Sequence, residues 1–481
     1  MTLAAQERRR FLLEEEKVGT ALAKLAMPSI AGMLVMAFYN LVDGYFIGML
    51  KNVDAQAGVT VAFPLFAIMM ASGQMVGMGG ASYISRQLGA KHHHKVEAAV
   101  ANVMVAVLAL TALVTATLLA WLDPVLLAFG ATEAALPYAH DFALPLVIGS
   151  GLVIFNMAAN ALIRSEGNTR TSMRGIIVGA ILNCVLGPLF MFAPLPLFET
   201  LGWSHSVRGA GWATFFSQMA SLLYLGGYLV AGHTVLRIRL RRAVWDWPMI
   251  RDIAGVGSAN FMRQALMATA MLFLNHAARL NAAAPEAMLA AVGVAGRLGS
   301  LPFYAVIGFL QAYQPFAGYN YGAKQFARLR EATRISVRFN TLLLLATTLA
   351  TLAFAPAIAH LFLPGHDAAS VQALEYAATM LRCMSLTLPL LAYHQVITSL
   401  YQAIGKISGS MVLSVARNGF FFIPLTWLIP ACSRWILGDA RWQGFTAGDI
   451  GVMLVNPAAD LLAASLTVVM AIRLTREMKN Y

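Results

Sequence analysis

The chain alternates between long apolar blocks and short polar connections. A helix needs roughly 20 apolar residues to cross a bilayer, because its backbone polar groups must be satisfied within the segment. Transmembrane β-strands would be about half as long and would alternate apolar with polar positions, which these blocks do not. The pattern predicts transmembrane helices over 25–48, 56–82, 100–121, 136–162, 174–195, 209–231, 252–278, 287–312, 337–360, 374–400, 408–430 and 450–472.

Composition and charge agree with a membrane protein. Hydrophobic residues make up 59% of the chain and charged residues 12%, against about 25% charged in a soluble domain. With both termini inside, most of the 34 Lys and Arg fall on the cytoplasmic side, as the positive-inside rule requires. We therefore expect a bacterial-type cytoplasmic (inner) membrane location. The net charge of +12 then comes from basic residues at the inner face, where anionic lipid headgroups attract them. No nucleic acid partner is expected.

The sequence repeats itself weakly, half a chain apart. Leu88–Lys91 matches Tyr321–Lys324, and Ala161–Gly167 matches Ser399–Gly405. Each half has six spans, so both halves share one orientation, as in parallel transporter repeats. We predict an all-α membrane protein with twelve transmembrane helices in two pseudo-symmetric six-helix lobes around a central cavity.

The predicted lobes are residues 1–240 and 241–481, linked by the Arg-rich stretch near 232–251. Two such lobes suit a monomeric transporter that works by alternating access. An intramembrane enzyme is disfavoured, because the sequence has no metalloprotease motif, no paired catalytic aspartates in facing spans and no serine-nucleophile motif. No ATP-binding loop is present, which argues against ATP-driven pumping by this chain alone. No organic cofactor is expected.

Ionisable groups inside a bilayer are costly and mark candidate functional positions. Asp43 lies inside the first span, with Asn40 one turn earlier. Desolvation favours the neutral form of a carboxylate, so Asp43 can exchange a proton or bind Na⁺. The alternative is an aspartate that caps a broken helix next to Gly44.

Other polar residues lie in later spans. Asn183 and Thr214 belong either to the cation site with Asp43 and Asn40 or to interhelical hydrogen bonding. Interhelical hydrogen bonding is also the alternative for Asn156 and Asn160 in the fourth span. No metal site is firm, and Na⁺ at Asp43, Asn183 and Thr214 is the one candidate. Arg263 needs a partner, and Asp460 either supplies it or forms a second protonatable site. The candidates for the substrate cavity are Asn156, Asn160, Arg263, Gln311, Gln314 and Asp460.

Several motifs resemble the multidrug and toxic compound extrusion transporters. The most specific is Gln314–Lys324 (QPFAGYNYGAK). Ser82–Lys91 and Arg164–Gly167 look like the family's loops after the second and fourth spans, and Pro28 and Asp43 have the family's spacing. The resemblance covers nearly the whole chain. It implies an antiporter that expels organic cations in exchange for H⁺ or Na⁺.

The resemblance also implies roles for single residues. Asp43 matches the coupling aspartate, Asn183 the fifth-span asparagine and Thr214 the sixth-span threonine. Many members have a second aspartate where this chain has Gly187. Because hard cations prefer several oxygen ligands, the departure favours H⁺ over Na⁺.

The main alternative is a flippase for a lipid-linked or amphiphilic substrate. A flippase of that kind needs a strongly cationic cavity for pyrophosphate. The predicted spans contain few cations, chiefly Arg263. Export of small organic cations is therefore the favoured function.

Overall fold

The computed structural model describes residues 3–193, 196–203, 205–231, 234–236, 238, 240–360, 368–438, 441 and 444–477. These residues contain no β-strand, so the predicted all-α class is confirmed. Contacts divide the chain into two compact units. The lobes 1–240 and 241–481 are a division by sequence and stay a prediction. Residues 232–233, 237 and 239 of the predicted link lie outside the described residues.

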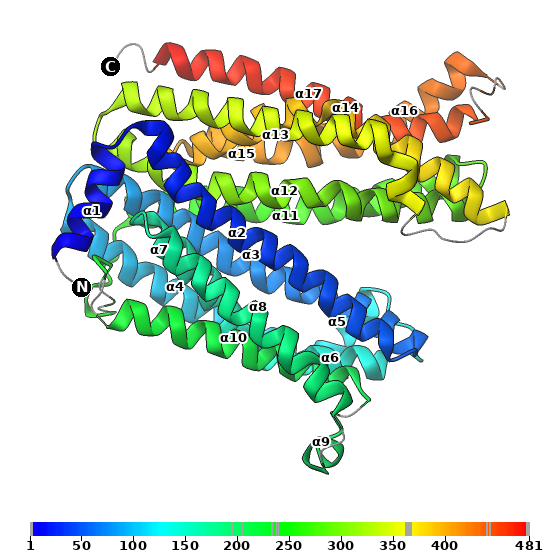
Figure 1. Ribbon diagram of the computed structural model, residues 1–481, viewed down its shortest axis with the longest axis horizontal. Helices are drawn as coiled ribbons and strands as arrows, with labels where there is room; N and C mark the ends of the chain where they lie inside the picture. Colours follow the sequence, from blue (N-terminus) through cyan, green and yellow to red (C-terminus); the bar gives the residue numbers. More distant parts are fainter. Residues whose placement is uncertain are drawn as a thin grey trace. The chain divides into compact units, whose positions relative to one another are not determined.

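Unit 1 consists of residues 1–261, 311–325 and 403–405. It also includes residues 247–261 of α11 (Trp247–Asn281) and 311–322 of α12 (Pro285–Gly322), two helices that are labelled in Figure 1. Its own helices are α1 (Leu3–Glu14), α2 (Val18–Met49), α3 (Val53–Gly89), α4 (His93–Ala120), α5 (Leu122–Ala128), α6 (Leu136–Ile148), α7 (Ser150–Ser165), α8 (Thr169–Phe192), α9 (Pro196–Thr200), α10 (Val207–Val230) and the 3₁₀ turn η1 (Leu240–Arg242).

Unit 2 consists of residues 262–310, 326–402 and 406–481. Its helices, some shared with unit 1 at their ends, are α11 (Trp247–Asn281), α12 (Pro285–Gly322), α13 (Phe326–His360), α14 (Ala368–Ala403), α15 (Ile407–Val415), the π-helix η2 (Ala416–Phe421), α16 (Phe422–Leu437) and α17 (Ala447–Glu477).

The helices have the length and surface that a bilayer requires. Among the described residues, eight helices are long and apolar enough to cross a membrane, and a bent pair makes a ninth. Three others, α10, α11 and α14, also match predicted spans but do not meet that combined limit. Large apolar side chains such as Leu272, Leu342 and Phe38 are exposed. Apolar surface on that scale fits contact with lipid.

The fourth span differs from its prediction as one helix over 136–162. The structure divides it into α6 and α7, which are bent by 54°. Pro145 in α6 has no N–H and removes a helical hydrogen bond. Gly149 lies at the break. A Cβ at this position would be 2.7 Å from the Phe215 ring, so the site favours glycine. The expectation of a single helix was wrong because both residues weaken the backbone locally.

The internal repeat is visible as a reciprocal contact within unit 1. A Cβ on Gly89, at the end of α3, would lie 2.0 Å from the carbonyl oxygen of Tyr319 in α12. A Cβ on Gly322, at the end of α12, would lie 2.0 Å from the carbonyl oxygen of Arg86 in α3. Only glycine permits this approach of two backbones. The repeated motifs therefore pack each helix end against the other.

Candidate functional site

Asp43 lies on α2, which continues through Gly44 to Met49. The alternative of an aspartate that caps a broken helix is therefore wrong. Asp43 is half-buried and makes no ion pair or hydrogen bond with the residues that the structure describes. Its charge acts on the Tyr39 phenol and on the Cys184 thiol of α8. The carboxylate thus faces the region where α2 packs against α8.

The structure joins two of the three other predicted coupling residues. The side chains of Asn183 and Thr214 are buried. Asn183 Nδ2 donates to Thr214 Oγ1 over 3.1 Å, and this hydroxyl donates to the Ala210 carbonyl over 3.1 Å. Asn40 is exposed on α2 and is not brought into this pair. The functional roles of Asp43, Asn183, Thr214 and Asn40 stay predictions.

Gly187 is the position at which the family resemblance led us to look for a second acid. It is buried on α8, one turn beyond Cys184, so both residues share a helix face. A Cβ at Gly187 would have nothing within 4 Å. The glycine therefore leaves open space beside the region on which the Asp43 charge acts.

That space predicts the effect of restoring the acid. We expect Gly187→Asp to fit without backbone strain and to create a Na⁺ site with Asp43. In the variant, Na⁺ at about 100 times its Kd is expected to add about 2.7 kcal/mol of stability. The measurement is Tm against Na⁺ concentration in purified protein. Gly187→Asn is the control of equal size, and an equal Na⁺ response in both variants would contradict this expectation.

Asn156 and Asn160 of α7 belong to one buried hydrogen-bonded chain. Asn156 Nδ2 donates to the carbonyl and the Oε1 of Gln218 on α10, each over 2.8 Å. Asn160 Nδ2 donates to the Asn156 carbonyl over 2.9 Å, and Ser172 Oγ of α8 donates to Asn160 Oδ1 over 2.8 Å. These contacts support the alternative of interhelical hydrogen bonding. A role in the substrate cavity stays a prediction.

Gln311 and Gln314 lie in the part of α12 that belongs to unit 1. Gln311 Nε2 has a weak contact of 3.6 Å with the Met33 sulfur on α2. Gln314 is 4% exposed, and its Nε2 has no hydrogen-bond partner. The structure therefore places both amides in a helix interface, with Gln314 still able to donate.

Asp460 of α17 is a buried carboxylate that forms an ion pair with Arg417. Arg417 Nε in η2 donates to Asp460 Oδ1 over 2.6 Å, and Thr387 of α14 donates to Oδ2 over 2.7 Å. These contacts do not include Arg263, so they do not support the first of the two alternatives for Asp460, and the functional roles of Asp460 and Arg263 stay predictions. A π-helix shifts the facing of its side chains, and the η2 turn carries Arg417. Arg263 lies on α11 in the same unit.

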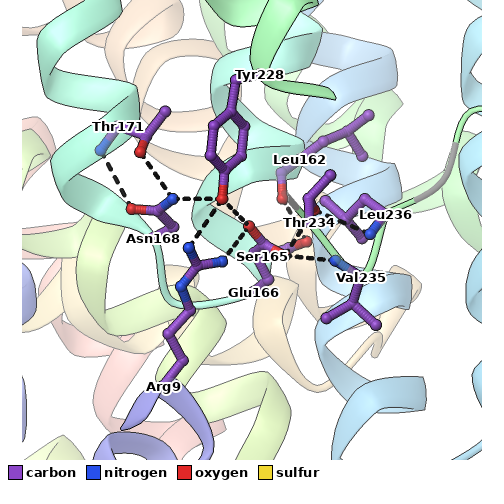
Figure 2. Close-up of polar contacts among 10 residues, drawn as sticks. All are labelled: Arg9, Leu162, Ser165, Glu166, Asn168, Thr171, Tyr228, Thr234, Val235 and Leu236. Atoms are coloured by element: carbon purple, nitrogen blue, oxygen red, sulfur yellow. Dashed lines mark hydrogen bonds and ion pairs between the residues drawn. The ribbon is translucent and has the colours of Figure 1, made fainter. Parts of the chain in front are cut away.

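A hydrogen-bonded network that we did not predict surrounds Glu166, which follows α7 (Figure 2). Arg9 Nη1 of α1 donates to Glu166 Oε1 over 2.6 Å, and Tyr228 of α10 donates to the same oxygen over 3.1 Å. The Thr234 hydroxyl and the Val235 N–H donate to Oε2 over 2.7 and 3.2 Å. Burial raises the pKa of Glu166, and the Arg9 charge opposes that shift. The network fixes α1 to unit 1.

Loss of this charge has a measurable consequence. Glu166→Gln is expected to cost about 1.5–3 kcal/mol, because a charge-assisted contact is lost and an amide N–H faces a donor. We expect a lower Tm and faster tryptic cleavage within α1. Glu7→Gln, an exposed position on the same helix, is the matched control and should leave both unchanged. Unaltered cleavage in Glu166→Gln would show that the network does not hold α1.

The long apolar helices define an integral membrane protein, and the comparisons define its class as a transporter. The chain belongs to the MatE family, whose model matches residues 28–189 and 260–428. The resemblance to the multidrug and toxic compound extrusion transporters is thus confirmed, and so are the twelve-helix fold and the absence of an enzymatic role.

Similar proteins cover most of the chain. An FAD transporter of Shewanella oneidensis is 25% identical over 472 residues, which are 96% of each protein. The multidrug export protein MepA of Staphylococcus aureus is 24% identical over 421 residues, 88% of this chain and 89% of MepA. A crystal structure of MATE in complex with MaL6 is 25% identical with a TM-score of 0.86, over 98% of this chain and 99% of that one.

Proposed function

We propose that the chain exports small organic cations in exchange for H⁺, with Asp43 as the coupling acid, by rocker-switch alternating access. The observation that supports this most is the half-buried Asp43 carboxylate, which has no ion pair among the described residues. An unpaired carboxylate in a membrane helix can exchange one cation for another. Similarity to MepA, a multidrug export protein, supports the substrate class.

In the proposed cycle, a proton and the cationic substrate compete for the negative charge of Asp43. A proton on Asp43 removes the charge that attracts a cationic substrate, so proton uptake on one side releases the substrate. Asn183 uses its Nδ2 to donate to Thr214. Its Oδ1 has no hydrogen bond among the described residues, and it is thus suited to accept from a protonated carboxyl or to contact a cation.

H⁺ is favoured over Na⁺ on chemical grounds. Na⁺ is a hard cation that is held by several oxygen ligands, whereas proton exchange needs one acid. Gly187 contributes no oxygen from a side chain. Asp43 is therefore sufficient for proton coupling and a poor basis for tight Na⁺ binding.

A second candidate function is export of an anionic dinucleotide. One relative is an FAD transporter. In unit 2, a cavity of about 430 Å³ is lined by Leu272, Asn275, His276, Arg279 and Leu289. An arginine and a histidine in such a cavity suit phosphate groups. Under this reading, the cationic residues of unit 2 attract the substrate.

We also propose the cellular setting. Lys and Arg are concentrated on one side of the predicted spans, which supports a bacterial-type cytoplasmic membrane with both termini inside. We expect a monomer surrounded by lipid, since each chain carries both halves of a transporter repeat.

Transport by the purified protein in vesicles tests the function. Uptake of a panel of fluorescent organic cations is measured while the pH and Na⁺ gradients are varied separately, with FAD and a fluorescent lipid in parallel. We expect cation uptake that follows the pH gradient and persists without Na⁺. Uptake of FAD alone would favour the dinucleotide, and movement of the lipid alone would favour a flippase. Collapse without Na⁺ at fixed pH would assign Na⁺ coupling.

A further inference from the structure

A small cavity of about 10 Å³ lies within unit 1, among α3, α7 and α12. Its polar lining consists of Arg164 and Ser165 of α7 and Gln311 and Gln314 of α12. A volume of this size holds about one water-sized body. The cavity is separate from Asp43, Asn183 and Thr214, none of which lines it.

The cavity is next to a buried positive charge. Arg164 is 7% exposed, and its Nη1 donates to Ser172 Oγ over 2.9 Å. No carboxylate forms an ion pair with Arg164 in the described part of the chain. Glu166, two residues away, is paired with Arg9. A buried guanidinium without a counter-charge is costly, so the site requires a negative partner from outside the protein.

Gln314 gives a second, independent sign of a ligand. Its Nε2 is buried and has no hydrogen-bond partner, although its side chain lines the cavity. An amide N–H that is buried without a partner costs about 1–3 kcal/mol. Guanidinium and amide N–H groups are both donors. Their convergence on one space selects a ligand that accepts hydrogen bonds and carries negative charge.

We propose that this cavity binds a small monovalent anion, with chloride as the physiological ion. Chloride is a monatomic anion, and phosphate and organic carboxylates are larger, so chloride is the anion that best suits a small space of this kind. The bound ion accepts from Arg164 and from Gln314 Nε2. Arg164 belongs to the first half of the sequence and Gln314 to the second. Occupancy therefore ties α7 to the end of α12 and stabilises their contact within unit 1.

Thermal stability of the purified full-length protein tests the site. Sodium chloride and sodium gluconate are compared at equal Na⁺ concentration, ionic strength and pH. We expect a saturable rise in Tm with chloride that bromide reproduces. Arg164→Gln should lose this rise, while Arg170→Gln, which removes an exposed charge nearby, should keep it. Gln314→Met should raise the chloride concentration at the midpoint about tenfold, the loss of one hydrogen bond to a charge.

Diffraction from the unaltered protein makes the test independent of folding in the variants. Crystals grown in bromide should show an anomalous peak between Arg164 and Gln314. A water molecule without anomalous signal at that place would overturn the proposal. An equal chloride response in Arg164→Gln and Arg170→Gln would overturn it as well.

Discussion

Ion-driven efflux is expected to fall to background when Asp43 is replaced by asparagine. The amide keeps the size of the side chain but can neither bind a proton at neutral pH nor attract a cation. Asp43 makes no ion pair or hydrogen bond among the described residues, so the variant should fold and reach the membrane in normal amounts. The measurement is efflux driven by a pH gradient in vesicles with matched protein content.

Two further variants make this result specific. Asp43→Glu keeps an acid on a longer side chain and should retain part of the transport. Asp54→Asn makes the same chemical change at an exposed position in the first turn of α3 and should transport normally. Normal efflux by Asp43→Asn would refute the coupling role of Asp43, even though the family assignment would stand.

The second large effect concerns the buried ion pair of unit 2. Asp460→Asn is expected to destabilise the protein by about 3–5 kcal/mol, because it leaves the Arg417 guanidinium without its charged partner. The Asp460 side chain is 2% exposed and that of Arg417 is 23% exposed, so water cannot fully replace the lost contact. The free energy of unfolding in detergent, measured by denaturant titration, checks this value.

Removal of both charges shows whether the destabilisation comes from loss of the ion pair itself or from leaving Arg417 buried without a partner. The double variant Arg417→Met with Asp460→Leu should recover to within about 1 kcal/mol of the natural protein, since apolar residues of similar volume often replace a buried pair without loss. The exposed pair of Lys406 and Glu477 is the matched control in the same unit, and Glu477→Gln should change stability by about 1 kcal/mol or less. A small effect of Asp460→Asn would show that Arg417 finds another partner.

The candidate coupling site shows how far a sequence can define a function. The sequence alone places Asp43 within an apolar helix. The known rise per residue of an α-helix then gives the approximate depth of Asp43 in the membrane. The pairing of Asn183 with Thr214 joins two separate helices and required coordinates. The same holds for the open space at Gly187, which depends on what α8 faces.

By itself, the sequence determined where the chain is apolar enough to enter lipid, where its two halves repeat, and which motifs it shares with a transporter family. These properties are local sums over neighbouring residues, so they need no knowledge of long-range contacts.

Only the tertiary structure decided how distant polar groups are partnered. Asp460 pairs with Arg417, 43 residues away, and Glu166 pairs with Arg9, 157 residues away. The close approach of the Phe215 ring to Gly149 likewise joins residues that are far apart in the chain. Ion pairs and close contacts act over a few ångströms between residues that are remote in sequence, and no local pattern specifies which residues meet.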